Sequence, residues 1–298
     1  MQCDKCGRNV VLFQEYSGQH LCRHHFEADV EAKAKHEIRR HRGITSNDHI
    51  GIALSGDKIS SALLYFMKKL TSDRRDIRIS AISIDEGITG YRDLGYAKRI
   101  ASLLDTECIM GSFQENFGIT IDEITQRKET TLSCSYCRVL RNFLLNRIAR
   151  EHGITKLAFG YTLDEGAVSV LKNVLKGVPE LVVNSEGVAR EKIPRIRPFH
   201  SVPQKEVELY ADLHIQGCDR SCCPYTNNPF EGDVHAMLNE FTVRHPATKY
   251  ALLSLEKNLA GACFSLTDSV HSCQQCGEPS DGICQDCRII HEVTAHGT

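Results

Sequence analysis

Pairs of cysteines separated by two residues occur in three separate stretches of this chain, and they constrain its fold more than any other feature. Such a pair presents two thiolates to one zinc ion, which takes four ligands in a tetrahedron. Each end of the chain supplies a complete set: Cys3, Cys6, Cys22 and His25 near the start, and Cys273, Cys276, Cys284 and Cys287 near the end. The spacing predicts one zinc ribbon over residues 1–26 and a second over residues 266–298. His24 is the alternative to His25.

The central pair, Cys134 and Cys137, differs because its only partner is the distant sequence Cys223-Pro224-Tyr225. Three thiolates leave one position of a metal centre open, which is typical of reactive rather than structural sites. Cys222 is an alternative third ligand, and Cys218 is a less favoured one. A third zinc site completed by Cys222 is the competing interpretation.

Composition supports metal binding by these thiols. The 298 residues carry a formal net charge of −2 and no apolar stretch long enough to cross a membrane, and the polar start lacks the pattern of a signal peptide. We therefore expect a cytoplasmic protein with reduced cysteines and no membrane contact. Two basic segments, 33–42 and 190–197, are candidate contacts for RNA phosphates, and solvated faces are the alternative.

Between the two cysteine modules the chain alternates short apolar strands with helices. A basic linker helix is predicted within residues 27–48, and an α/β domain over residues 49–265. Predicted strands are 49–54, 77–84, 106–110 and 156–159, and predicted helices are 62–70, 93–104, 138–152, a helix from about 161 through 176, 203–215 and 233–244. Repeated strand–helix units indicate a doubly wound parallel sheet with right-handed crossovers. Ligands of such sheets bind outside the carboxyl ends of the strands, here the loops at Ser55, Asp85 and Gly160.

The first of these loops has the composition of an anion site. The sequence from Ser55 to Ser61 reads SGDKISS and leads directly into a predicted helix. The N-terminus of a helix offers free backbone N–H groups and a positive dipole end to a phosphate. The loop therefore predicts a phosphate-binding turn.

Taken in order, these motifs resemble the tRNA 2-thiouridine synthetases of the TtuA/NcsA type, which belong to the PP-loop group with the adenine-nucleotide alpha-hydrolase fold. The resemblance covers essentially the whole chain. Besides the ribbons it rests on four motifs: residues 84–87 (IDEG), 134–137 (CSYC), 195–198 (RIRP) and 223–225 (CPY). It implies that ATP adenylates the C2 oxygen of a tRNA uridine, and that sulfur carried on a [4Fe–4S] cluster at Cys134, Cys137 and Cys223 replaces this oxygen.

The resemblance also implies roles for further residues and partners. Nucleotide contacts fall on Ser55, Gly56, Lys58, Ser60, Ser61, Asp85 and Gly160, and catalytic roles on Arg141, Asp164 and Glu165. The implied cofactors are the cluster, two zinc ions and ATP with Mg²⁺. The implied partners are tRNA, a ubiquitin-like sulfur carrier or free sulfide, and a second copy in a homodimer.

The chain departs from the family at the nucleotide site. The family loop reads Ser-Gly-Gly-Lys-Asp-Ser, so Asp57 replaces a glycine and Ile59 replaces an aspartate. A carboxylate ~4 Å from a phosphate costs about 4 kcal/mol at an effective dielectric of about 20. The second signature, Gly-His-Asn-Leu-Asp-Asp-Glu, has become GYTLDEG over residues 160–166, and Arg138 takes the place of a glycine. These changes favour the alternative, a divergent paralogue acting as an RNA- or sulfur-binding scaffold without efficient ATP turnover. The retained cysteines favour the enzyme.

Overall fold

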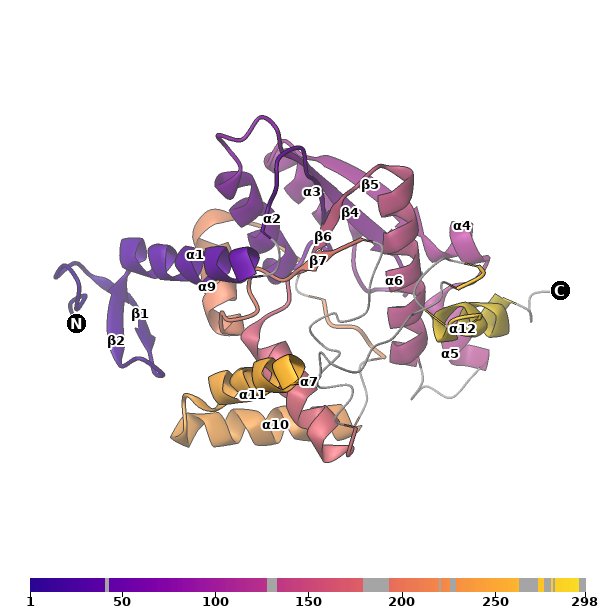
Figure 1. Cartoon of the computed structure of the whole chain (residues 1–298). Helices are drawn as coiled ribbons and strands as arrows, with labels where there is room; N and C mark the ends of the chain where they lie inside the picture. Colours follow the sequence, from indigo (N-terminus) through magenta and orange to yellow (C-terminus); the bar gives the residue numbers. More distant parts are fainter. Residues whose placement is uncertain are drawn as a thin grey trace.

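A parallel five-stranded sheet forms the centre of the molecule (Figure 1). The computed structural model describes residues 1–40, 43–127, 133–178, 193–219, 221–225, 229–262, 273–275, 280 and 282–294. The strands lie in the order β5-β4-β3-β6-β7. Their bounds are β3 His49–Ala53, β4 Arg78–Asp85, β5 Glu107–Ser112, β6 Lys156–Ala158 and β7 Arg195–Ile196.

Helices cover both faces of this sheet, because successive strand residues point alternately to either side. On one face, a core joins β3 to α1, α2, α3 and α9. On the other face, a core joins β4 to α4, α5 and α6. The helices are α1 Arg23–Arg40, α2 Lys58–Leu70, α3 Leu94–Leu103, α4 Phe113–Phe117, α5 Ile121–Arg127, α6 Ser133–Glu151 and α9 Gln204–His214. The predicted doubly wound parallel sheet is confirmed.

The order of the strands reverses at β3, which pairs with β4 on one side and with β6 on the other. Ile50 of β3 lies opposite Ile79 of β4 and Lys156 of β6. Loops that leave two such strands diverge to opposite faces of the sheet and open a crevice between them. The loops after β3 and β6 therefore flank the natural ligand site of this fold.

The cysteine modules lie at opposite ends of the view in Figure 1. The first is an antiparallel hairpin of β1 (Val10–Gln14) and β2 (Gln19–Cys22), followed directly by α1. The second includes α12 (Gln285–Thr294), which packs against α6. A layer of α7 (Leu163–Leu175), α10 (Pro229–Arg244) and α11 (Thr248–Ala262) completes the fold. None of the described helices is long and apolar enough to cross a membrane.

Candidate active site

The N-terminal ligand group has the spacing that a zinc ion requires. Zinc with bonds of about 2.3 Å to sulfur and 2.0–2.1 Å to nitrogen places its ligand atoms roughly 3.6–3.8 Å apart. The thiol of Cys6 lies 3.6 Å from that of Cys22, and Nδ1 of His25 lies 3.4 Å from the sulfur of Cys3 and 3.5 Å from that of Cys22. His25, and not His24, belongs to this group.

Three cysteines of the C-terminal module are also gathered. The ligand atoms of Cys273, Cys284 and Cys287 lie within 4.8 Å of one another, and the sulfurs of Cys273 and Cys287 are 3.8 Å apart. Cys276, the fourth predicted ligand, lies outside the described residues. Both terminal groups can hold a tetrahedral metal ion.

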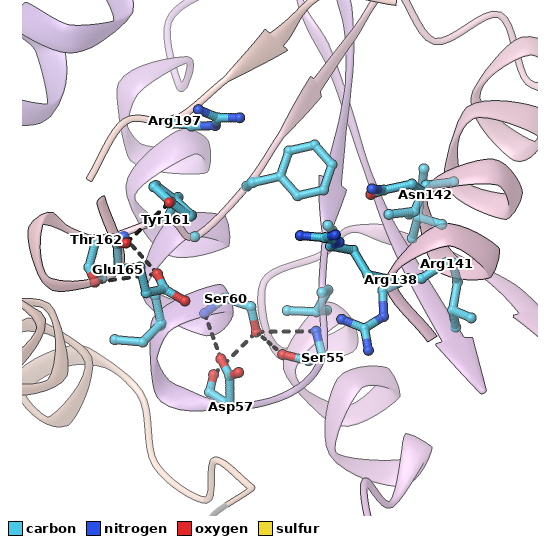
Figure 2. A pocket seen from close by; sticks show the side chains of 18 of the residues that line it. Ser55, Asp57, Ser60, Arg138, Arg141, Asn142, Tyr161, Thr162, Glu165 and Arg197 are labelled. Atoms are coloured by element: carbon cyan, nitrogen blue, oxygen red, sulfur yellow. Dashed lines mark hydrogen bonds between the residues drawn. The ribbon is translucent and has the colours of Figure 1, made fainter. Parts of the chain in front are cut away.

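A cavity of about 710 Å³ opens at the reversal point of the sheet. It collects residues from the loops after β3, β4 and β6, as Figure 2 shows for several of them. Of the predicted site residues it is lined by Ser55, Ser60, Arg141, Gly160 and Glu165. Its size falls within the range of small-ligand sites, roughly 300–1,000 Å³.

In the loop after β3, which lines the cavity, the side chain of Asp57 caps the helix that follows. Asp57 is the N-cap of α2, and its Oδ1 accepts a hydrogen bond from the backbone N–H of Ser60 at 2.8 Å. The hydroxyls of Ser55 and Ser60 are 2.9 Å apart, and the Ser60 hydroxyl also accepts from the N–H of Ser55 at 3.2 Å. A carboxylate therefore occupies the helix end that would otherwise receive a phosphate. This cap also makes α2 begin at Lys58, earlier than the predicted Ala62.

Glycine is required at two places around this loop. Gly56 has φ +87°, and a Cβ there would lie 2.9 Å from the backbone nitrogen of Ala97. At Gly160 a Cβ would lie 2.9 Å from the side chain of Ile59. Ile59 therefore packs directly on the loop after β6. The family has an aspartate in place of Ile59.

Other predicted nucleotide residues lie away from the cavity. Lys58 forms an ion pair with Asp212 of α9 at 2.6 Å and lines a second cavity, of about 620 Å³, together with Cys218. Ser61 is buried in α2. Asp85 accepts a hydrogen bond from the N–H of Gly87 at 2.8 Å and does not line the main cavity.

The two predicted catalytic carboxylates of α7 point in different directions. Oε2 of Glu165 accepts hydrogen bonds from the N–H and hydroxyl of Thr162, which makes a capping box at the start of α7 on the cavity wall. Desolvation in the cavity raises the pKa of Glu165 above its ordinary value. Asp164 faces away, accepting from the N–H of Gln204 at 2.6 Å and from Nζ of Lys249 at 2.5 Å. The capping box was visible in the sequence as Thr-x-x-Glu.

Five arginines of the described residues line the cavity, and no motif in the sequence indicates that they meet there. This arginine wall consists of Arg92, Arg138, Arg141, Arg195 and Arg197. The guanidinium of Arg195 lies over the ring of Phe159 at 5.1 Å, and that of Arg197 lies over Tyr161 at 5.0 Å. Guanidinium groups bind phosphate oxygens in a forked, bidentate geometry, so the wall is suited to a polyanionic ligand.

Cys134 and Cys137 lie beside this wall in the first turn of α6. The helix begins at Ser133, so the expectation that both cysteines precede a helix starting near Arg138 is wrong. Arg141, one turn further on, donates a hydrogen bond to the sulfur of Cys137 at 2.9 Å and pairs with buried Glu86 at 2.8 Å. Burial raises the pKa of the Cys137 thiol, and the positive charge of Arg141 opposes that rise.

The segment 217–225 brings Cys223 toward the same place. The thiol of Cys134 donates to the carbonyl of Tyr225 at 3.2 Å, and the Tyr225 side chain is fixed by Asp122 at 2.7 Å. Cys223 packs with Tyr225 against the core that contains Cys137. Cys222 is exposed.

The basic segment of α1 is largely neutralised by its own helix. Lys33 pairs with Asp29 at 2.6 Å, Lys35 with Glu31 at 3.5 Å, and Arg40 lies 4.0 Å from Glu37. Arg39 is exposed. His41 and Arg42, like most of the second basic segment including Arg190 and Lys192, lie outside the described residues.

A parallel sheet of this order, with a cavity at its reversal point and cysteine groups at both ends of the chain, defines a PP-loop-type α/β protein with candidate metal-binding modules. Residues 2–27 match the family described as "2-thiouridine synthetase TtuA, N-terminal LIM domain". The tRNA 2-thiolation protein NcsA of Haloferax volcanii is 32% identical over 324 residues, covering 99% of this chain and 100% of that protein. The chain belongs to the NcsA/TtuA family of tRNA 2-thiolation proteins.

Two further relatives extend the likeness. The tRNA-5-methyluridine(54) 2-sulfurtransferase of Pyrococcus horikoshii is 28% identical, covering 97% of this chain and 93% of that protein. The solved structure of the U34-tRNA thiolase NcsA from Methanococcus maripaludis, with its [4Fe-4S] cluster, matches with a TM-score of 0.85 and 27% identity. That match covers 98% of this chain and 96% of the thiolase.

Proposed function

We propose that this chain is a tRNA sulfurtransferase, which replaces the C2 oxygen of a uridine by sulfur at the expense of ATP. The observation that carries the proposal is that one helix serves two sites. The first turns of α6 present Cys134 and Cys137, and the same turns send Arg138 and Arg141 into the cavity. A sulfur site therefore adjoins a site for an anionic activating group. Relatives named for tRNA 2-thiolation along nearly the whole chain support this assignment.

Cys134, Cys137 and Cys223 would hold the [4Fe–4S] cluster. Their ligand atoms form no group within 4.8 Å among the described residues, which suits a cluster better than zinc because each cysteine binds a different iron. A cluster held by three cysteines supplies one iron with an open position for the sulfur that is transferred. The exposed thiol of Cys134 and the half-buried thiol of Cys223 leave the site accessible from outside.

Arg141 is the residue best placed to act between the two sites. Glu86 holds its guanidinium, so the side chain is fixed before any substrate binds. A fixed cation beside the sulfur of Cys137 can stabilise negative charge at the cysteine site and on an adenylated uridine in the cavity. Glu86 also holds Arg92 at 2.7 Å, so a single buried carboxylate orients two arginines.

The terminal groups would each hold one zinc ion with a structural role. Their ligands are already at zinc distances, and modules of this size obtain much of their folding free energy from the metal. The sulfur donor would be free sulfide or a ubiquitin-like carrier. The cytoplasm suits a protein whose described cysteines form no disulfide, and a homodimer is the proposed assembly.

tRNA would be held by phosphate contacts outside the cavity, with exposed Arg39 of α1 as one of them. Each neutralised phosphate adds to the dependence of binding on salt. Replacing Arg39 by Ala should therefore weaken tRNA binding and flatten its salt dependence. An affinity that stays unchanged at every salt concentration would assign Arg39 to a solvated face.

The test is thiolation itself. Anaerobically purified protein, unmodified tRNA, ATP and sulfide should yield 2-thiouridine in nucleoside mass spectrometry, and mapping the product identifies the position. Cys137→Ser should abolish the product, whereas Cys108→Ser, which changes a cysteine of β5 outside all three groups, should not. If the wild type binds tRNA but does not thiolate it, the alternative function is favoured, that of an RNA- or sulfur-binding scaffold without efficient ATP turnover.

A further inference from the structure

We propose that the cavity binds the triphosphate of ATP through its arginine wall, with no divalent cation at the loop after β3. The inference rests on the proposed function, because ATP is the ligand which that function requires. The family resemblance implies Mg²⁺, and Mg²⁺ is bound through carboxylate and phosphate oxygens in an octahedral geometry. Each carboxylate among the described residues that line this cavity already gives one oxygen to another contact.

The loop after β3 offers fewer oxygen ligands than the family loop, because Ile59 stands where the family has an aspartate. The carboxylate of Asp57 caps α2 through the N–H of Ser60, and Ile59 packs its apolar side chain beside Gly160. Asp85, at the end of β4, holds the N–H of Gly87 and does not line the cavity. A cation that drew the capping oxygen of Asp57 away from the N–H of Ser60 would cost about 0.5–2 kcal/mol in helix stability.

The opposite wall is no better supplied. Glu165 is used in the capping box with Thr162, and Asp164 is turned away toward Lys249. Glu86 is buried between Arg92 and Arg141 and is neutralised by both. Among the described residues, these carboxylates form no group of three with ligand atoms within 4.8 Å of one another, as a magnesium site would require.

Positive charge takes the place of the cation. The described residues that line the cavity include five arginines and three carboxylates (Asp57, Glu86 and Glu165), which gives them a net charge of +2. Arg138 is the central member, because it makes no ion pair or hydrogen bond with another described residue and stands where the family has a glycine. The loop has thus gained a carboxylate while the facing helix has gained a guanidinium. Figure 2 shows Arg138 and Arg141 on the side of the cavity opposite Glu165.

The shape of the site favours a nucleotide over the backbone of an RNA. The arginines surround a cavity of about 710 Å³ instead of following an exposed ridge. That volume is in the range of small-molecule sites. The rings of Phe159 and Tyr161, each covered by an arginine, line the same cavity and add flat surfaces for a base.

The first experiment measures ATP binding by calorimetry on the full-length, anaerobically purified protein, once with EDTA and once with excess MgCl₂. We expect dissociation constants that agree within about threefold. Each tenfold change is about 1.4 kcal/mol. A loss of tenfold or more in EDTA would overturn the inference.

Variants identify the residues responsible. Arg138→Ala should weaken ATP binding in EDTA by about tenfold or more, the value of one charge-assisted contact, and Arg138→Lys should restore part of it. Arg147→Ala is the matched control, since Arg147 lies on the same helix and pairs with Glu151 at the surface. Iron content must match the wild type in each variant. Unchanged binding by Arg138→Ala would contradict the inference.

Restoring the family residues in the loop after β3 should restore the binding of Mg²⁺ together with ATP. The double change Asp57→Gly with Ile59→Asp removes the self-capping carboxylate and adds the carboxylate that the family has. We expect its ATP affinity to rise about tenfold on adding MgCl₂, whereas that of the wild type does not. Failure of MgCl₂ to strengthen ATP binding by this double variant would contradict the inference that Asp57 and Ile59 keep Mg²⁺ from the loop.

The two proposals can fail separately. ATP binding that is unaffected by EDTA, without any thiolation of tRNA, would contradict the proposed function and leave this inference standing. Thiolation that requires both ATP and Mg²⁺, with ATP binding lost in EDTA, would support the proposed function and contradict this inference.

Discussion

The N-terminal ligand group and the central cysteines both begin with a Cys-x-x-Cys sequence, yet the fold holds them differently. In the first, Cys3, Cys6, Cys22 and His25 place their ligand atoms within 4.8 Å of one another. In the second, Cys134 is exposed and its thiol donates a hydrogen bond to a backbone carbonyl, while Cys137 is buried and its sulfur accepts a hydrogen bond from Arg141. One site is closed around a metal position, and the other opens beside a cavity.

The difference follows from how each site is assembled. The N-terminal ligands come from the turn before β1, the end of β2 and the first turn of α1, so local structure alone fixes their spacing. The central site needs α6 and the distant segment 217–225, which meet only through tertiary contacts. A locally fixed site is suited to a structural ion, and a site built across elements can admit a substrate.

The largest expected effect is on the stability of the N-terminal module. Cys22→Ala removes a buried ligand, and apparent free energies of structural zinc binding are roughly 10–16 kcal/mol, so the variant should lose one zinc and unfold the hairpin. Proteolysis and hydrogen exchange over residues 1–27 report this directly. Cys137→Ala should keep the unfolding temperature near that of the wild type. Equal destabilisation by the two changes would remove the distinction between the sites.

The next effect is on iron content and identifies the third cluster ligand. Cys223 packs inward with Tyr225, whereas Cys222 is exposed and Cys218 lies beside the second cavity. Cys223→Ala should therefore abolish cluster absorbance in anaerobic protein, and Cys222→Ala and Cys218→Ala should retain most of it. The reverse outcome for Cys222 would move the ligand by one position.

Four of the five strands of the central sheet were predictable, because buried parallel strands are short apolar runs, whereas the two-residue β7 and the hairpin strands β1 and β2 were missed. The predicted starts of α2, α6 and α10 were each four or five residues too late. Asp57 caps α2, and α6 begins at Ser133, five residues before its apolar pattern becomes clear. The pattern also missed α11 and α12, whose apolar positions depend on packing against α7 and α6.

The candidate site was predictable only in part, because its decisive contacts are tertiary. The sequence shows Lys58 in a phosphate loop, but not that Asp212 of α9 holds it away from the cavity. Arg92, Arg138 and Arg195 come from three separate elements, so no spacing along the chain indicates that they meet. The terminal ligand sets, by contrast, follow from short spacings alone.

The smallest expected effect concerns the junction between the N-terminal module and the core. Buried Glu206 accepts from Tyr16 at 2.8 Å, and burial raises the pKa of its carboxyl above the ordinary 4.5. The folded state therefore binds this proton more tightly than the unfolded state, so the stabilisation from protonated Glu206 is lost as pH rises through the raised pKa. In urea unfolding, the free energy of unfolding of the wild type should fall, relative to that of Glu206→Gln, as the pH rises from the ordinary to the raised pKa of Glu206. A constant difference across pH would contradict the raised pKa.

Metal analysis of anaerobically purified wild-type protein tests the central distinction most directly. The account predicts two zinc ions per chain from the terminal groups, together with the iron and acid-labile sulfide of one [4Fe–4S] cluster from the central cysteines. Exposure to oxygen should remove the iron and leave the zinc. A third zinc in place of iron would contradict the account, because it would make the central cysteines a structural site like the other two.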